Sequence, residues 1–339
     1  MNTSAPIPYI HFLRVTATVA VIFIHVGAMF QSSCDMKSCE NSYFQYEFIH
    51  RLCSFAVPVF VLISGLLLLN PKKEITYQSI LHKYIPRIAW ALLLFGSVMN
   101  LTEAYMTRKC DETLLDIILV SGINLLTGNC WDHMWYLYML IGLYALTPVY
   151  KAFINISDRA GMNIFMGAMT AMCIVLPYLR QANIAPINSY FTLPVFLFLY
   201  PCGYYIGTVC PKKKLFATIM VLILITYCLH TAWQAWHGYE AYPGYSPLTV
   251  CAALAIFYLG RYFSSSNPWL LNHLSKHCFC IYIIHAIILN VAFKVLHIES
   301  VLHFAPLINA FFVVLFTFLL SYFVSCMLRQ IPFLREKVL

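Results

Sequence analysis

The sequence predicts an all-α protein, a polytopic membrane bundle of about ten transmembrane helices with both termini in the cytoplasm. Three observations predict this fold. Of the 339 residues, 61% are hydrophobic and only 10% are charged, whereas about 25% are charged in soluble domains. Apolar segments recur along the whole chain, each near the length that crosses a bilayer as a helix. The basic residues of the loops concentrate in every second loop.

The apolar segments are expected to form one transmembrane domain over residues 1–339, with no soluble appendage. The fourth and eighth segments are short. Several prolines fall in or near the segments, and membrane helices tolerate them where neighbouring helices satisfy the freed backbone groups. In chain order the expected helices are Pro8–Phe30, Phe48–Leu69, Tyr84–Ala104, His133–Tyr150, Gly161–Leu179, Tyr190–Val209, Leu215–Trp236, Pro247–Tyr262, Cys278–Leu296 and Phe304–Leu328.

The loops between these segments predict the orientation of the bundle. Every second loop is rich in lysine and arginine, whereas the others hold few basic residues and most of the acidic ones. Cytoplasmic loops carry the excess of Lys and Arg in membrane proteins, so the basic loops and both termini are expected in the cytoplasm. The net charge of +8 therefore reflects orientation, and no nucleic-acid partner is expected. The longest outer stretch, Met106–Asp132, has room for one amphipathic helix at the membrane interface.

Two ionisable residues, Arg14 and His25, lie inside the first apolar segment, eleven positions apart. On a helix they return to within about 20° of one face and are separated by about 16 Å along the axis. Ionisable side chains inside a membrane are costly and mark functional sites, so this face is expected to line a protein cavity. The alternative is an arginine that reaches the headgroups and a histidine satisfied by a neighbouring helix.

Further cations lie near the ends of the second and third segments. Arg51 either reaches into an outward-facing cavity or extends to the headgroups. Lys83 and Arg87 are four residues apart, so they are predicted to share a helix face. Two cations on one face favour a phosphate or a lipid headgroup between them, and two separate membrane anchors are the alternative.

Histidines also occur in the fourth and ninth segments. His133 follows Asp132 at the outer entrance, where a carboxylate neighbour lets a histidine titrate near neutral pH. Trp135 beside it is typical of the aromatic belt of membrane proteins. His285 lies at membrane depth, and Tyr282, three residues earlier, shares its face. With the polar face of the first segment, these side chains are predicted to form a polar track into the bundle.

Four cysteines fall in the expected outer loops. Cys34 and Cys39 lie in the first and Cys110 and Cys130 in the second. On an oxidising face they are able to form two disulfides in three different pairings, and four free thiols are the alternative. The sequence has no Walker pattern, no HExxH and no paired CxxC motif, so no metal is expected.

Several of these segments together resemble the acyltransferase-3 family of integral-membrane O-acyltransferases. The resemblance covers essentially the whole chain, and its landmarks occur in the order of the family. The nearest likeness is to the single-domain branch that acetylates bacterial surface polysaccharides such as the enterobacterial common antigen. The residues that carry the resemblance are Arg14-x10-His25, Val57-Pro58-Val59-Phe60, Ser64-Gly65, the pair Lys83 and Arg87, His133-Met134-Trp135-Tyr136-Leu137, the run Leu140–Pro148, and Ile281-Tyr282-Ile283-Ile284-His285.

The resemblance implies a multi-pass enzyme of the bacterial cytoplasmic (inner) membrane that uses cytoplasmic acyl-CoA. Its donor is expected to be acetyl-CoA, with succinyl-CoA as the alternative. Its acceptor is expected to be a hydroxyl of an extracytoplasmic sugar or cell-surface glycan, whether free or lipid-linked. The other partners are membrane lipids, and the oligomeric state is open because small-residue interfaces occur throughout such bundles.

The candidate site residues receive hypothetical roles in this reaction. His25 is expected to act either as the general base or as the carrier of a covalent acyl group. Arg14, His285 and Tyr282 are the other expected catalytic residues, of which His285 or Tyr282 orients His25 or donates to the developing oxyanion. The expected CoA-phosphate ligands are Lys83 and Arg87, with Arg14 deeper. The expected acceptor ligands at the outer mouth are Arg51, His133 and Trp135.

Two other classes of protein fit part of this pattern. A transporter or flippase of a surface glycan or lipid-linked precursor also needs polar residues in a cavity, but it needs no acyl-CoA. The lack of a clear internal repeat disfavours many transporter folds. A membrane sensor would have polar residues without a path that joins both faces.

Overall fold

The protein was analysed as a computed structural model that describes residues 7–33, 40–107, 113–131, 133–238, 244–263, 269–302 and 305–339. Within these ranges every regular element is a helix. Nine helices of the described part are long and apolar enough to cross a membrane, and the helix Pro247–Phe263 is apolar but shorter. The prediction of an all-α polytopic bundle is therefore confirmed.

The ten expected segments correspond to ten helical stretches, several of which contain π-helical turns or breaks. Four short helices, α7, α14, α16 and α18, lie outside them. The α-helices are α1 (Pro8–Ser33), α2 (Glu40–Cys53), α3 (Ala56–Leu68), α4 (Tyr77–Ser79), α5 (Ile85–Ala91), α6 (Ser97–Thr107), α7 (Leu114–Thr127), α8 (Trp135–Ile156), α9 (Arg159–Thr170), α10 (Leu176–Gln181), α11 (Val195–Tyr204), α12 (Lys214–Trp236), α13 (Pro247–Phe263), α14 (Trp269–Ser275), α15 (Cys278–Asn290), α16 (Glu299–Leu302), α17 (Pro306–Leu328) and α18 (Pro332–Lys337).

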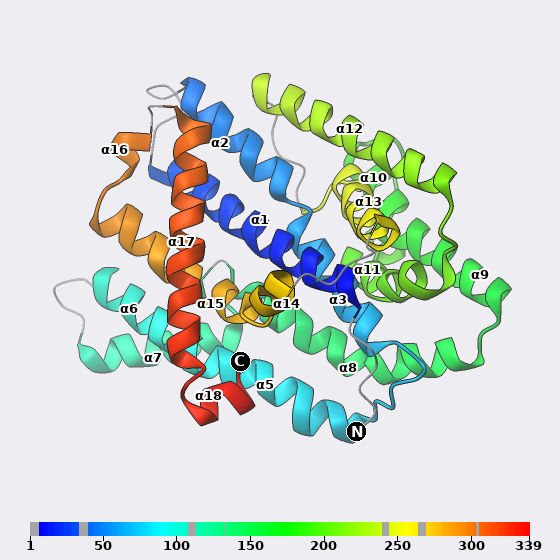
Figure 1. Cartoon of the computed structure of the whole chain (residues 1–339), viewed down its shortest axis with the longest axis horizontal. Helices are drawn as coiled ribbons and strands as arrows, with labels where there is room; N and C mark the ends of the chain where they lie inside the picture. Colours follow the sequence, from blue (N-terminus) through cyan, green and yellow to red (C-terminus); the bar gives the residue numbers. More distant parts are fainter. Residues whose placement is uncertain are drawn as a thin grey trace.

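Helix α1 runs through the middle of the bundle (Figure 1) and contacts α2, α3, α13, α14, α15 and α17. Its proline at the first helical position suits a helix start, because the missing N–H would be unpaired there in any case. Small and branched side chains such as Ala17, Val21 and Val26 are buried along it. The buried face of α1 therefore contacts protein, which is what a polar side chain at this depth requires.

The second expected segment is two helices rather than one. Helix α2 ends at Cys53 and α3 begins at Ala56. Pro58 explains the break, because in a continuous helix its ring would clash with the carbonyl of Ser54. The hydroxyl of Tyr227 on α12 donates to the carbonyls of Arg51, at 2.5 Å, and Leu52, at 3.3 Å, near the end of α2. The hydrogen bonds of Tyr227 to these carbonyls thus connect α12 to the end of α2.

Helices α3 and α11 cross in direct backbone contact. A Cβ atom added at Gly65 would lie 1.7 Å from the carbonyl oxygen of Tyr200, and one added at Gly203 would lie 1.9 Å from that of Leu62. Close approach through small residues is the usual way in which membrane helices associate. This crossing holds α3, which lines the functional cavities, in a fixed position.

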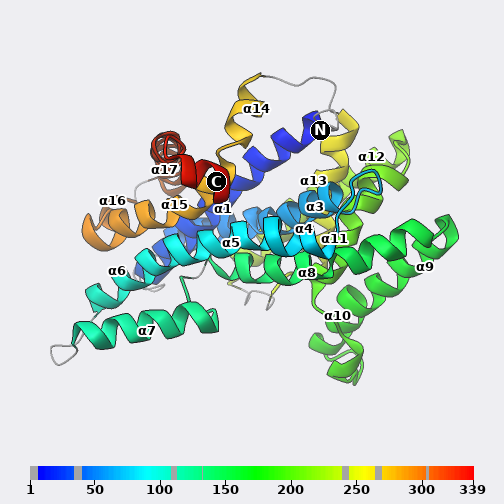
Figure 2. The ribbon, with the colours of Figure 1, turned by 90° about the horizontal axis from the view of Figure 1, so that it is seen from below.

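The outer stretch Met106–Asp132 contains helix α7, which lies beside α6 at one end of the molecule (Figure 2). Thr113 and Asp116 form a capping box at its start, and Gly128 ends it at a φ of 81°. The hydrogen bonds from Thr113 hold the pKa of the Asp116 carboxyl below its ordinary value. Its placement at a membrane interface stays a prediction.

Candidate active site

Three histidines from distant parts of the chain meet inside the bundle, and we call them the histidine cluster: His25 on α1, His133 just before α8, and His285 on α15. The ring centroid of His25 lies 4.9 Å from that of His285 and 6.0 Å from that of His133. The His133 and His285 centroids are 5.4 Å apart. His285 is fully buried and His133 is 3% exposed. The predicted meeting of His25 and His285 is thus observed, and His133 joins them.

The hydrogen bonds of the cluster assign the proton positions of two rings. His285 Nδ1 lies 3.2 Å from the Ile281 carbonyl oxygen, which only accepts, so Nδ1 carries the proton. Its Nε2 is then an acceptor, 3.2 Å from His25 Nδ1. His25 Nδ1 also lies 2.8 Å from the Val21 carbonyl, so it is the protonated nitrogen of His25. In this assignment, inferred from geometry, the basic nitrogen of His25 is Nε2.

Tyr282 lies next to the cluster on α15. Its hydroxyl donates to the backbone carbonyl of His133, and its ring centroid is 5.7 Å from that of His133. Because this hydroxyl is engaged, the geometry favours a role in positioning His133 over donation to an oxyanion. Tyr282 also lines two cavities that approach the cluster from different sides of the bundle.

The first of these cavities, which we call the basic cavity, has a volume of about 450 Å³. It opens toward the face of the bundle where α1 begins and α17 ends. No aspartate or glutamate lines it, and the Arg14 guanidinium forms no ion pair with a carboxylate side chain of the described residues. A cavity lined by several cations and by no acidic side chain is suited to an anion. Its basic lining residues are Arg14, Lys73, Arg87, Lys276 and Arg329.

One expected phosphate ligand is not part of the basic cavity. Arg87 lines it, but Lys83 does not and is exposed. The predicted shared face assumed an α-helix, whereas residues Ile80–Tyr84 form a π-helical turn. A π-turn pairs residues five apart, so positions four apart no longer point the same way. Lys83 therefore does not join Arg87 in the lining of the basic cavity, where Lys73 and Lys276 lie instead, and a joint role of Lys83 and Arg87 stays a prediction.

The last residues of the chain share these cations. Arg87 Nε donates to the Val338 carbonyl at 3.1 Å, and its Nη2 donates to the Leu339 carbonyl. Arg329 Nη1 reaches the same Leu339 oxygen at 3.2 Å. Arg14 lines the same cavity but is not among the partners of these last residues.

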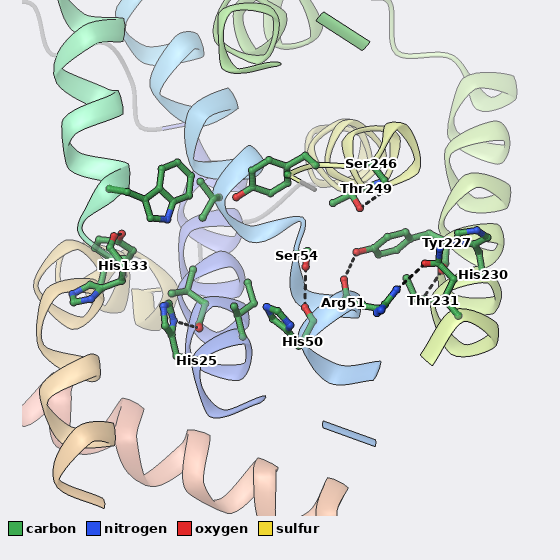
Figure 3. Close-up of a pocket in the computed structure, with 18 residues that line it drawn as sticks. His25, His50, Arg51, Ser54, His133, Tyr227, His230, Thr231, Ser246 and Thr249 are labelled. Atoms are coloured by element: carbon green, nitrogen blue, oxygen red, sulfur yellow. Dashed lines mark hydrogen bonds between the residues drawn. The ribbon is translucent and has the colours of Figure 1, made fainter. Parts of the chain in front are cut away.

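A second cavity, of about 390 Å³, reaches the histidine cluster from the opposite face (Figure 3), and we call it the Arg51 cavity. His25 and His133 lie at one end and Arg51 at the other. Arg51 Nε donates to Glu47 Oε1 at 2.5 Å, and Nη1 donates to Gln234 at 3.4 Å. Trp135, 39% exposed, also lines this cavity. Arg51 and Trp135 thus lie where a ligand from the opposite face would enter.

His133 lies deeper than expected. The sequence suggested a place at the outer mouth, because His133 follows a loop and precedes a tryptophan. In the structure its side chain turns inward to His25 and His285. The neighbouring Asp132, proposed to tune it, lies outside the described residues.

A third cavity, of about 480 Å³, also reaches His25 and His133, and we call it the amide cavity. It lies on the other side of the cluster, toward α6 and α7. Its residues come from four separate parts of the chain and form no motif, so the sequence did not predict it. Its polar and aromatic lining residues, besides the two histidines, are Ser32, Asn100, Glu103, Asn124, Asn129, Cys130, Trp131, Asn290 and Lys294.

Of the four cysteines proposed to form disulfides, Cys34, Cys39 and Cys110 lie outside the described residues. Cys130 is a free thiol. Its sulfur lies 3.1 Å from Asn100 Nδ2 and 3.3 Å from the Tyr138 hydroxyl. The disulfides stay a prediction. Within the ranges that the structure describes, no group of three or more His, Cys, Asp or Glu side chains is placed to hold a metal ion.

Comparison with known proteins gives one match. Residues 7–326 match the sequence model of a family described as an acyltransferase domain, the acyltransferase-3 family. No curated protein and no solved structure matches the chain.

Proposed function

Because the chain belongs to the acyltransferase-3 family, we propose that this membrane acyltransferase transfers an acetyl group from acetyl-CoA to a sugar hydroxyl at the other face of the bilayer. The observation that carries the proposal is the position of His25. His25 lines both the Arg51 cavity and the amide cavity, which reach it from one face of the bundle. Tyr282 beside it lines the Arg51 cavity and also the basic cavity, which opens to the opposite face.

The basic cavity suits the donor. CoA carries several phosphate charges, and fixed arginines and lysines bind phosphates well. Arg14 and His25 are separated by about 16 Å along α1, an offset that leaves room for the pantetheine arm between the phosphates and the thioester. Succinyl-CoA would bind the same cations and differ only at the acyl end.

The histidine cluster suits base catalysis. His285 accepts from His25 Nδ1–H, and this contact directs the lone pair of His25 Nε2 away from His285. Nε2 takes the proton of the acceptor hydroxyl as its oxygen attacks the thioester carbon. The C–S bond then breaks, and the thiolate of CoA receives the proton from the imidazolium. In the alternative, His25 itself attacks the thioester and carries the acyl group to the hydroxyl.

The cavities of the opposite face suit the acceptor. Arg51, His133 and Trp135 are proposed to bind it, as polar and aromatic side chains do for a hydroxylated ring. The proposed orientation has the basic cavity on the cytoplasmic side of a bacterial inner membrane, as the positive-inside rule predicts. The single-domain branch that acetylates surface polysaccharides remains the proposed subfamily.

Purified protein in detergent tests the proposal. Wild type is expected to bind acetyl-CoA saturably and to release free CoA slowly. His25→Ala should still bind acetyl-CoA but release CoA at least about 100-fold more slowly, because general bases contribute about 10²–10⁴-fold. His82→Ala, an exposed histidine, is the matched control. Folded protein that binds no short-chain acyl-CoA would contradict the proposal and favour a transporter.

A further inference from the structure

The amide cavity differs chemically from the basic cavity. Its two charged lining residues neutralise each other, because Lys294 Nζ lies 2.8 Å from Glu103 Oε1. The other polar groups are amides, a hydroxyl, a thiol and the ring nitrogens of tryptophan and histidine. A cavity with balanced charge and many neutral polar groups suits a neutral polar ligand rather than a phosphate.

Buried polar atoms without a partner concentrate at this cavity. In the described part of the chain seven side-chain polar atoms are buried without a hydrogen bond, and three of them belong to its lining residues: Trp131 Nε1, His133 Nε2 and Asn290 Oδ1. The backbone of Ile283 also faces the His133 ring. Such atoms cost free energy unless a ligand or an ordered water satisfies them, so each requires an explanation.

The three atoms have complementary hydrogen-bonding roles. Indole Nε1–H only donates, and an amide Oδ1 only accepts. An imidazole nitrogen does either, according to its tautomer. A hydroxyl both donates and accepts, so a ligand with several hydroxyls satisfies all three. Trp131 also offers a flat aromatic ring of the kind on which a sugar ring packs.

We propose that the amide cavity is a second sugar subsite, so that the acceptor is a glycan chain with units on both sides of His25. This inference rests on the proposed function and specifies its acceptor. The Arg51 cavity and the amide cavity share His25 and His133. Their volumes of about 390 and 480 Å³ fall within the range of about 300–1,000 Å³ that is usual for small-ligand sites. Each has room for sugar units, and the reacting hydroxyl lies between them.

The test uses two substitutions that remove the polar atoms without a partner. Trp131→Phe deletes the Nε1–H and keeps an aromatic ring. Asn290→Leu replaces the amide, Oδ1 together with the Nδ2 that donates to Ala286, by a side chain of similar size. Matched controls are Trp236→Phe and Asn155→Leu, because both residues are exposed and lie outside all three cavities. Acetyl transfer from acetyl-CoA is measured to the intact cell-envelope glycan of the host and to the same glycan after hydrolysis to monosaccharides.

The proposal expects transfer to the intact glycan to exceed transfer to the monosaccharides at least tenfold. Trp131→Phe and Asn290→Leu should each raise the KM for the intact glycan about fivefold or more. The KM for acetyl-CoA and the rate of acetyl-CoA hydrolysis without acceptor should stay unchanged, which also shows that the variants are folded. The control variants should behave as wild type.

Three results would overturn this proposal alone, and a fourth would also overturn the proposed function. Equal transfer to glycan and monosaccharides, or unchanged KM in both variants, would mean that the amide cavity holds only water. Hydrolysis of acetyl-CoA without transfer to either sugar preparation would mean that the acceptor is not a glycan, although the donor reaction stands. Failure of the folded protein to bind or hydrolyse acetyl-CoA would overturn the proposed function itself.

Discussion

Two arginines on membrane-spanning helices, Arg14 and Arg51, have opposite surroundings. Arg51 donates to Glu47 at 2.5 Å and to Gln234, so its position and charge are fixed by the protein. Arg14 lines a cavity with four other basic residues and forms no ion pair with a described carboxylate. A buried cation without a carboxylate is costly, and a bound anion offsets that cost. The comparison supports the proposal that Arg14 binds a ligand directly, whereas Arg51 shapes a neutral site.

The same contrast separates the two faces of the bundle. The basic cavity holds cations without acids, and the amide cavity holds one balanced Lys–Glu pair. Under the proposed function, an anionic donor fits the first of these cavities and a neutral acceptor the second. The histidine cluster lies where these environments meet.

The largest expected effect is on donor affinity, and it separates the two arginines. Arg14→Gln should weaken acetyl-CoA binding by about 10- to 100-fold, because a hydrogen bond to a charged group contributes about 1.5–3 kcal/mol. Arg51→Gln should leave that affinity within about twofold and instead raise the KM for the acceptor. Isothermal titration in detergent measures the first value and initial rates measure the second. Equal loss of donor affinity in both variants would contradict the division of roles.

A packing substitution at the α3–α11 crossing is expected to affect stability. Gly65→Ala would place a Cβ 1.7 Å from a backbone oxygen, so the helices must separate, at a cost of about 1–3 kcal/mol. Gly142→Ala on α8 is the control, because nothing lies within 4 Å of its added Cβ. Thermal unfolding in detergent should show a lower midpoint for the first variant alone. A wild-type midpoint for Gly65→Ala would show that the crossing is not rigid.

A smaller effect is expected from the hydrogen-bond partner of His25, the proposed catalytic base. His285→Leu removes the acceptor of His25 Nδ1–H and should lower kcat by about tenfold, roughly 1.4 kcal/mol. The KM for acetyl-CoA should not change, because His285 does not line the basic cavity. His285→Asn, which retains a side-chain acceptor, should recover part of the rate. A higher KM with normal kcat would instead place His285 in donor binding.

The smallest effect distinguishes two lysines near the basic cavity. Lys73 lines the cavity and Lys83 does not, so only Lys73→Ala should weaken acetyl-CoA binding. The expected change is about two- to fivefold, because exposed ionic contacts contribute about 0.2–1 kcal/mol. Added salt should reduce the difference between Lys73→Ala and wild type. A stronger effect of Lys83→Ala would restore the role first predicted for it.

The sequence predicted the helices well because hydrophobicity and length determine membrane crossing. It also predicted the meeting of His25 with His285, since ionisable groups inside a membrane must share a protein interior. It failed where local geometry departs from a straight α-helix. Residues Ile80–Tyr84 form a π-turn, and Lys83 does not line the basic cavity with Arg87.

The depth of His133 and the existence of the amide cavity were not predictable from spacing. His133 precedes its helix, so helical periodicity did not apply to it. The amide cavity combines residues from α1, α6, the α7–α8 region and α15. Only the packing of these helices brings them together, and no sequence interval records that packing.

The most direct test of the account asks whether donor and acceptor act from opposite faces. The protein is reconstituted in vesicles, its orientation is sorted through a tag at the N-terminus, because the C-terminal residue Leu339 lines the basic cavity, and labelled acetyl-CoA is supplied on one side only. The account predicts acetylated glycan on the far side when acetyl-CoA is on the side of the basic cavity, and none with His25→Ala. Equal transfer from acetyl-CoA on either side, or transfer only to glycan on the donor side, would contradict it.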